Sequence, residues 1–580
     1  MVTSPDRYLN VARGYRPTPV ADGGLYFASD MAGLPQTYRI DGPDRFPVRV
    51  APSQNRTLPI VETPFGLLLR HDHDGNEIWQ LSMLTEGGEL RQLTEDPRAM
   101  HRGVVPTPDG LRAGLAFNPD GRADWALGVI DLETGSIGAR VDRGGYWSWL
   151  AWDGDGEVAV VGEARGNVAN RAHLLRGAEL QPLLSTATLV EGAFWAGGRL
   201  YLIADVDSEY QGLVEVDPAE PERIARWLIR EEHDVDVAVP APDGRHALVA
   251  INRGPYDELR VLDLESGESR SLDLEPGLVT ADNVVSAGEN VAWAGERLLV
   301  AWESSSRPAD IVEPETRTRW TMAGGDGAPE LPAPIEVEIE SFDGVTVPAL
   351  HHRVDGTPRP TVVYFHGGPE SQLRASFTPQ VAMWLGAGFD VLAPNVRGST
   401  GYGRRYLSLD DRGLRWDAVR DGCVVGRWAK EHGGATSLVA MGGSYGGFMT
   451  LAVLVEDPEL WDLGVDIVGI ADWHSFLRNT SGWRRSMRVA EYGEPDGPDG
   501  EFLAEFSPLR RADRIKARLL IIHGRNDPRV PVGEAEQIHQ AVPGSELLIL
   551  DDEGHGLTKH GNRSRAYGHA VDFVREGLRD

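Results

Sequence analysis

Short apolar runs broken by polar turns fill the first half of the chain. Stretches with two such runs around a turn of Gly, Asp, Pro or Asn begin roughly every 40 to 50 residues, the repeat length of propeller blades. Seven of them are residues 25–40, 66–84, 112–132, 158–175, 200–216, 246–264 and 297–312. The even spacing predicts a β-propeller of seven blades. Six or eight blades, and a pair of β-sandwiches, stay open as alternatives.

The pattern changes near residue 335, where apolar strands begin to alternate with stretches of helical periodicity. The predicted strands are residues 335–340, 347–352, 361–365, 389–393, 438–441, 465–470, 519–522 and 546–550. The predicted helices are residues 380–388, 414–432, 446–457, 533–541 and 564–578. Such alternation predicts a mostly parallel sheet with helices on both faces.

A serine surrounded by glycines lies at the centre of this second half. Ser444 follows the apolar strand 438–441 and precedes a helical stretch, with Gly442, Gly443, Gly446 and Gly447 around it. A strand-to-helix turn tight enough to expose a serine hydroxyl leaves no room for neighbouring side chains. We therefore interpret Ser444 as a nucleophile on an elbow, with a plain glycine-rich turn as the alternative.

A nucleophilic serine needs a general base and an acid that orients the base. Asp527 and His555 follow two late strands in the order acid then base, at the edge of the sheet where Ser444 lies. His474 and His523 precede the acid, so we expect structural roles for them. Asp551 and Asp552 are rival acids that lie too near His555 along the chain.

An oxyanion hole needs two backbone N–H groups aimed at the developing negative charge. We expect one of them from Tyr445, the residue after the nucleophile. The other is expected from Gly368, in the His-Gly-Gly-Pro loop of residues 366–369 that follows strand 361–365.

A propeller followed by this constellation resembles the prolyl oligopeptidase family of serine peptidases over essentially the whole chain. The motifs that carry the resemblance are residues 366–369, 395–403, 442–447, 527–529 and 554–556. The His-Gly-Gly-Pro loop and the Asp-x-Arg motif look most like the acylaminoacyl-peptidase branch. The resemblance implies that Arg529 holds a backbone carbonyl or carboxylate of the peptide. It also implies that Trp473 and Phe476 wall the pocket for the residue before the cleaved bond, with buried core aromatics as the alternative.

The change of pattern and a Pro- and Gly-rich linker at residues 314–334 predict the domain organisation, and the resemblance implies how the N-terminus and the propeller act in it. Residues 1–19 would be an N-terminal segment that packs on the catalytic domain, residues 20–325 the β-propeller, and residues 326–580 an α/β-hydrolase domain. The propeller would cap the active site and admit only short peptides or acyl-peptides, and the reaction would need no metal or organic cofactor.

Composition narrows the range of possible binding partners and cellular locations. Acidic residues outnumber basic ones by 88 to 57, giving a formal net charge of -31, which argues against nucleic acid and anionic membranes as partners. One cysteine, Cys423, excludes an internal disulfide bond. Residues 1–15 lack the apolar core of a secretory signal, and no apolar run is long enough to span a membrane. We expect a cytoplasmic protein, and homo-oligomer formation stays open.

Three functional hypotheses follow. The first is a serine peptidase that cleaves short or N-acylated peptides through an acyl-enzyme. The second is a hydrolase of non-peptide esters or amides with the same triad, and the third is an interaction protein whose hydrolase domain is idle. An adjacent acid pair, Glu231 and Glu232, is a candidate anchor for a substrate ammonium group, with a solvated surface pair as the alternative.

Overall fold

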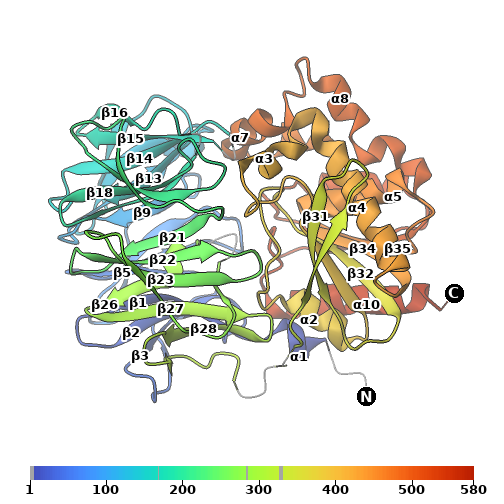
Figure 1. The fold of residues 1–580 in the computed structure, drawn as a ribbon, viewed down its shortest axis with the longest axis horizontal. Helices are drawn as coiled ribbons and strands as arrows, with labels where there is room; N and C mark the ends of the chain where they lie inside the picture. The colour runs from blue at the N-terminus through green and yellow to red at the C-terminus, as the bar shows by residue number, and fades with distance from the viewer. Residues whose placement is uncertain are drawn as a thin grey trace.

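Two bodies of different architecture lie side by side (Figure 1). The computed structural model describes residues 5–166, 169–187, 189–281, 285–325, 329 and 331–579. Seven small antiparallel sheets form the first body, and one eight-stranded sheet with helices forms the second.

The seven small sheets are the blades of a β-propeller. The first four contain β1 (Gly14–Pro19), β2 (Leu25–Ser29), β3 (Gln36–Ile40), β4 (Val48–Arg49); β5 (Thr57–Thr63), β6 (Gly66–His71), β7 (Gln80–Leu84), β8 (Leu90–Gln92); β9 (His101–Pro106), β10 (Arg112–Phe117), β11 (Ala126–Asp131), β12 (Ile137–Val141); and β13 (Trp147–Trp152), β14 (Val158–Ala164), β15 (Asn170–Arg176), β16 (Glu179–Leu183). The last three contain β17 (Val190–Ala196), β18 (Arg199–Ala204), β19 (Gly212–Val216), β20 (Ile224–Ile229); β21 (Val235–Pro240), β22 (His246–Asn252), β23 (Asp257–Asp263), β24 (Ser269–Ser271); and β25 (Leu278–Val279), β26 (Val291–Ala294), β27 (Arg297–Ser304), β28 (Arg307–Glu313), β29 (Thr318–Arg319). The prediction of seven blades is confirmed.

Each stretch predicted from the sequence corresponds to the two middle strands of one blade, from β2 and β3 to β27 and β28. The first strand of the first blade was missed. It begins at Gly14, within the residues assigned to the N-terminal segment. Its two prolines disguised it, since proline is tolerated only at the edge of a sheet, and β1 pairs with β2 alone.

The second body is built on one sheet with the order β30-β31-β33-β32-β34-β35-β36-β37. Its strands are β30 (Ile335–Glu340), β31 (Thr346–His352), β32 (Arg359–Phe365), β33 (Asp390–Pro394), β34 (Ala435–Gly443), β35 (Leu463–Ile467), β36 (Arg518–Gly524) and β37 (Glu546–Leu550). Antiparallel pairs join β30, β31 and β33, and every later pair is parallel. All eight predicted strands are present.

Helices cover both faces of this sheet. They are α2 (Pro379–Gly386), α3 (Arg404–Leu407), α4 (Arg415–Glu431), α5 (Tyr445–Glu456), α6 (Trp473–Asn479), α7 (Gly482–Tyr492), α8 (Gly500–Glu505), α9 (Gly533–Ala541) and α10 (His560–Gly577). Apolar side chains of α4, α5 and α9 share one core with the sheet, and those of α2 and α10 share the core on its other face. The order and layering are those of an α/β-hydrolase domain.

A short N-terminal helix lies against the second body rather than the propeller. This helix, α1 (Asp6–Leu9), lies near α2 and α10 in Figure 1. Leu9 is fully buried in the core under α2 and α10, and the Asn10 side-chain amide donates to the Ser564 hydroxyl at 2.9 Å. The chain thus touches the second body before it enters the first blade.

The connection between the two bodies follows β29. The predicted domain boundary at residues 325 and 326 adjoins residues 326–328, which lie outside the described residues. No helix in the described part of the chain is both long and apolar enough to cross a membrane.

Candidate active site

Ser444 lies on a sharp turn between β34 and α5, at the carboxyl end of the parallel strands. Its backbone has φ 60° and ψ −120°, a conformation that costs free energy for any residue with a side chain. A β-carbon added at Gly446 would lie 2.1 Å from the carbonyl oxygen of Phe365, and one at Gly442 would lie 2.4 Å from the carbonyl oxygen of Gly446. Gly442 and Gly446 are therefore required by contact with the backbone, whereas a β-carbon added at Gly443 would lie no closer than 3.8 Å to any atom beyond its chain neighbours.

A buried carboxyl group lies beneath this turn. Asp466 is fully buried on β35, and its carboxyl group faces the backbone N–H of Gly469. β-Carbons added at Gly447 and Gly469 would lie 2.4 and 2.1 Å from its Oδ1, so the two glycines make room for the carboxyl group. Burial raises the pKa of Asp466 to about 7.

Asp527 and His555 meet at the same edge of the sheet. Asp527 follows β36, His555 follows β37, and the Asp527 Oδ2 lies 2.6 Å from the His555 Nδ1. The Asp527 Oδ1 accepts hydrogen bonds from the backbone N–H groups of Arg529 and Val530 at 2.8 and 3.0 Å. Burial pushes the pKa of Asp527 upward, but the His555 charge and hydrogen bond outweigh it and bring this pKa below its ordinary value.

The rival histidines contact backbone carbonyl groups, although the His523 Nε2 also lies 3.6 Å from the Asp527 Oδ2. His523 is fully buried, and its Nε2 lies 2.9 Å from the Val530 carbonyl oxygen, while the His474 Nε2 lies 2.8 Å from the Gly500 carbonyl oxygen. Both therefore hold backbone, as expected from the sequence.

The rival acids are paired with neighbouring cations. Asp551 accepts from the Arg525 Nε at 2.6 Å, and Asp552 accepts from the Lys559 Nζ at 3.0 Å. Asp527 is the acid that the structure brings to His555.

The His-Gly-Gly-Pro loop lies against the nucleophile. A β-carbon added at Gly367 would lie 3.4 Å from the Ser444 β-carbon. Gly368 has φ 132°, which favours glycine, and among the described residues no acceptor is bonded to its N–H or to the N–H of Tyr445. His366 anchors the loop through its Nε2, 2.9 Å from the Ser399 hydroxyl.

No hydrogen bond joins the Ser444 hydroxyl to His555 among the described residues. The structure therefore brings acid and base together, and it places the serine beside the loop of the expected oxyanion hole. Catalytic hydrogen bonds are often long in the free enzyme and shorten when substrate binds.

Arg529 is held by a propeller residue that the sequence analysis did not identify. Its Nε lies 2.9 Å from both carboxylate oxygens of Glu77, and its Nη2 lies 2.8 Å from Oε1. Glu77 lies in the loop between β6 and β7 and is 8% exposed. Burial pushes its pKa upward, but the Arg529 charge outweighs this effect and the pKa falls below its ordinary value. No local motif marks Glu77, because its partner lies in the other domain.

Trp473 and Phe476 are buried in an aromatic cluster beside the oxyanion loop. They are 1% and 3% exposed. The Trp473 ring lies 4.5 Å from the Tyr492 ring, centroid to centroid, and the Tyr492 hydroxyl donates to the Gly368 carbonyl oxygen at 3.5 Å. That Trp473 and Phe476 form the walls of a substrate pocket remains a prediction.

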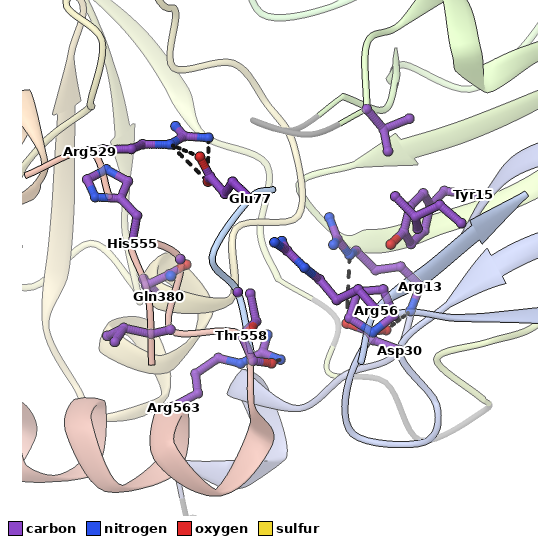
Figure 2. A pocket seen from close by; sticks show the side chains of 17 residues that line it. Arg13, Tyr15, Asp30, Arg56, Glu77, Gln380, Arg529, His555, Thr558 and Arg563 are labelled. Atoms are coloured by element: carbon purple, nitrogen blue, oxygen red, sulfur yellow. Dashed lines mark hydrogen bonds and ion pairs between the residues drawn. The ribbon is translucent and has the colours of Figure 1, made fainter. Parts of the chain in front are cut away.

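A cavity of about 190 Å³ borders His555 at the junction of the two domains (Figure 2). Its polar lining combines propeller and N-terminal residues with residues of the second domain: Arg13, Asp30, Arg56, Glu77, Gln380, Arg529, Thr558 and Arg563. The propeller therefore contributes directly to the surroundings of His555.

Comparison with known proteins agrees with this site. Residues 375–580 match the model of the prolyl oligopeptidase family, and they contain Ser444, Asp527 and His555. The match to this family is limited to the C-terminal part of the chain.

Two curated proteins of similar sequence have different names, and the match spans a different share of each. Dipeptidyl aminopeptidase BIII of Pseudoxanthomonas mexicana is 27% identical over 554 residues, which cover 89% of this chain and 78% of that protein. The acylamino-acid-releasing enzyme of Homo sapiens is 29% identical over 302 residues, which cover 49% of this chain and 40% of that protein. The match thus spans less than half of the human protein.

A solved structure supports the whole two-domain fold. The puromycin-hydrolyzing peptidase of Mycobacterium tuberculosis superposes with a TM-score of 0.85 at 20% identity, covering 99% of this chain and 96% of that one. At this level of identity the similarity establishes the fold.

Replacing the buried carboxyl group below the elbow should change how stability depends on pH. Because the pKa of Asp466 is raised to about 7 when folded, the folded protein binds a proton that the unfolded chain has lost above about pH 4. The contribution of Asp466 to the free energy of unfolding therefore falls as the pH rises from about 4 to 7. Above about pH 7 the carboxyl group is ionised in both states, and this contribution no longer changes. The unfolding midpoint of Asp466→Asn in urea, relative to wild type, should be higher at pH 8 than at pH 5. An equal difference at both pH values would contradict this assignment.

Proposed function

We propose that this chain is a serine peptidase of the prolyl oligopeptidase family that cleaves short peptides through an acyl-enzyme. The observation that carries the proposal is the strained Ser444 elbow, whose nucleophile lies against the oxyanion loop. The Asp527–His555 pair at 2.6 Å supplies the base and its orienting acid beside this elbow.

The proposed reaction begins with proton transfer. His555 accepts the Ser444 hydroxyl proton through its Nε2 as the serine oxygen attacks the peptide carbonyl carbon. Asp527, bonded to the other ring nitrogen, holds the tautomer and stabilises the imidazolium. His555 then protonates the leaving amine, and water hydrolyses the acyl-enzyme by the same steps in reverse roles.

The oxyanion would bind to the Tyr445 and Gly368 N–H groups. Both donors have no acceptor among the described residues, so they are available when charge develops on the carbonyl oxygen. Donors of this kind contribute about 10²–10³ in rate each. Tyr492, bonded to the Gly368 carbonyl, fixes the orientation of this peptide unit.

The Glu77 pair refines the role proposed for Arg529. Because Glu77 compensates its charge, Arg529 suits a neutral backbone carbonyl of the substrate better than a carboxylate. We therefore propose that Arg529 positions the peptide backbone and that Glu77 positions Arg529.

We propose a preference for N-acylated or short peptides over free amino termini. The His-Gly-Gly-Pro loop, the Asp-x-Arg motif and the similarity to an acylamino-acid-releasing enzyme support it. Glu231 was the sequence candidate for binding a free ammonium group, but Arg253 and Arg260 hold its two oxygens at 2.7 and 2.6 Å. A structural role for Glu231 explains these contacts.

Hydrolysis of one matched pair tests the peptide preference. Acetyl-alanyl-anilide should be cleaved faster than alanyl-anilide with the same leaving group, since Glu231 is not available for an amine. The Ser444→Ala protein serves as the blank and should lose on the order of 10⁶ in kcat. Faster cleavage of the free amine would instead indicate an aminopeptidase, and cleavage of a phenyl ester alone would favour the esterase hypothesis.

The role of Arg529 separates peptide from ester hydrolysis. Arg529→Gln should lower kcat/KM for the anilide at least about tenfold more than for a small ester, because only the peptide has a backbone carbonyl to hold. This variant leaves Glu77 buried without its charge partner, which is itself destabilising. The double variant Glu77→Gln/Arg529→Gln controls for this effect. Its loss of kcat/KM on the anilide, relative to its loss on the ester, should equal that of the single variant. Equal losses on both substrates would argue against a peptide-holding arginine.

A further inference from the structure

The cavity beside His555 has a cationic lining in a strongly acidic protein. Acidic residues outnumber basic ones by 88 to 57 in the whole chain, yet four arginines and two carboxylates line this cavity. Figure 2 shows these arginines on the walls between His555 and the propeller. A local reversal of charge beside a catalytic residue suggests that the cavity selects a substrate group.

Three of the four arginines have carboxylate partners. Arg529 pairs with Glu77, Arg56 donates from its Nε to Asp72 at 2.9 Å, and Arg13 lies 4.0 Å from Asp30. Their charges are therefore compensated within the protein, so the positive charge of the lining is attributed to the fourth arginine.

Arg563 differs from these three. Among the described residues no carboxylate lies within ion-pair distance of its guanidinium group, whose Nη2 donates to the Thr558 carbonyl oxygen at 3.4 Å. Its Nε is buried without a hydrogen-bond partner. Arg563 as a whole is partly exposed, but a guanidinium group with a buried donor and no ion-pair partner is costly, and an anionic ligand would satisfy both its charge and its donors.

Nearby charges offset only part of the effect of burial. Burial lowers the pKa of Arg563 and the Arg13 charge adds to this effect, whereas the Asp30, Tyr567 and Glu553 charges raise the pKa without bringing it back to its ordinary value. A bound carboxylate would offset the cost of burying this charge.

A second arginine near the catalytic residues has the same property. Arg484 on α7 lies over the Trp483 ring at 5.2 Å, its Nε is buried without a partner, and no described carboxylate pairs with it. On the same helix Arg485 and Arg488 pair with Glu494 and Glu491, each at 3.3 Å. Two guanidinium groups without an ion-pair partner among the described residues therefore occur in the region that surrounds the Glu77–Arg529 pair.

We propose that the cavity between His555 and Arg563 is an anion subsite that takes a carboxylate of the peptide substrate, with Arg563 as its anchor. This inference rests on the proposed peptidase function, for which it names a substrate class. The carboxylate has two sources in a short peptide: the free carboxyl terminus of the leaving part, or an acidic group on the acyl part.

Two substrate pairs distinguish these sources. Acetyl-alanyl-alanine and its carboxyl-terminal amide differ in charge on the leaving side, and succinyl- and acetyl-alanyl-anilide differ in charge on the acyl side. In wild type, one pair should show at least about tenfold higher kcat/KM for the anionic member, the gain expected from a charge-assisted hydrogen bond. The preference should weaken as NaCl is raised, because salt screens charge pairs.

Arg563→Gln should bring the ratio of kcat/KM for the anionic substrate to kcat/KM for the neutral substrate close to one. Arg563→Lys should retain part of the wild-type preference. Arg565→Gln is the matched control, since Arg565 is an exposed arginine on the same helix, and should keep the wild-type ratio. Ratios near one for both pairs in wild type, or an undiminished preference in Arg563→Gln, would overturn the proposal. Thermal unfolding of each variant shows whether it is folded.

Binding to the Ser444→Ala protein separates the subsite from the catalytic claim. Calorimetric titration with acetyl-alanyl-alanine and with its amide, and with the succinyl and acetyl anilides, measures anion preference without turnover. A preference in binding that Arg563→Gln removes, together with no peptide cleavage by wild type, would refute the peptidase function and keep the subsite. Cleavage of neutral anilides with no anion preference in binding would refute the subsite and keep the peptidase function.

Discussion

The close contact of backbone with backbone at the Ser444 turn is the constraint on which the rest of the site depends. The turn fits between β32 and β35 only because glycines replace side chains there, as the 2.1 Å approach of a Gly446 β-carbon to the Phe365 carbonyl shows. The same contact brings the loop after β32 against the nucleophile. The position of the proposed oxyanion donors is therefore fixed by the packing that strains the serine, and the energetic cost of φ 60° is balanced by the surrounding sheet.

Ionic contacts between the domains complete the site from the other side. Glu77 reaches from the second blade to Arg529, and Arg374 from the second domain donates to the Gly254 carbonyl at 2.8 Å and pairs with Asp257 at 2.7 Å. These contacts make the propeller part of the candidate active site. They also explain how a cavity lined by both domains can adjoin His555, where we propose that charge in the lining acts on substrate choice.

Much of the fold could be predicted because buried strands leave a strong pattern. The middle strands of each blade, such as β14 with four consecutive buried residues, have apolar runs that the sequence shows directly. Outer strands such as β24, exposed along its whole length, leave no such pattern. The insertion of α6, α7 and α8 between β35 and β36 was missed as well. With seven and six residues, α6 and α8 are too short to show a periodic pattern, whereas the amphipathic pattern of α7 is present in the sequence.

The catalytic candidates were predictable for a different reason. Ser444, Asp527 and His555 each follow a strand of the parallel sheet, so chain order and turn chemistry place them at one edge. Glu77 and Arg563 could not be found this way. Glu77 matters because it forms an ion pair with a residue hundreds of positions away, and Arg563 because it lacks an ion-pair partner among the described residues. No local sequence pattern shows either property.

The nucleophilic character of Ser444 is the central claim, and active-site labelling tests it most directly. The folded protein would be treated with a fluorophosphonate and the modified residue located by mass spectrometry of tryptic peptides. The account predicts a single modification on the peptide that contains Ser444, absent from Ser444→Ala and much slower in Asp527→Asn. No modification of the folded wild-type protein, or modification at another serine, would contradict it.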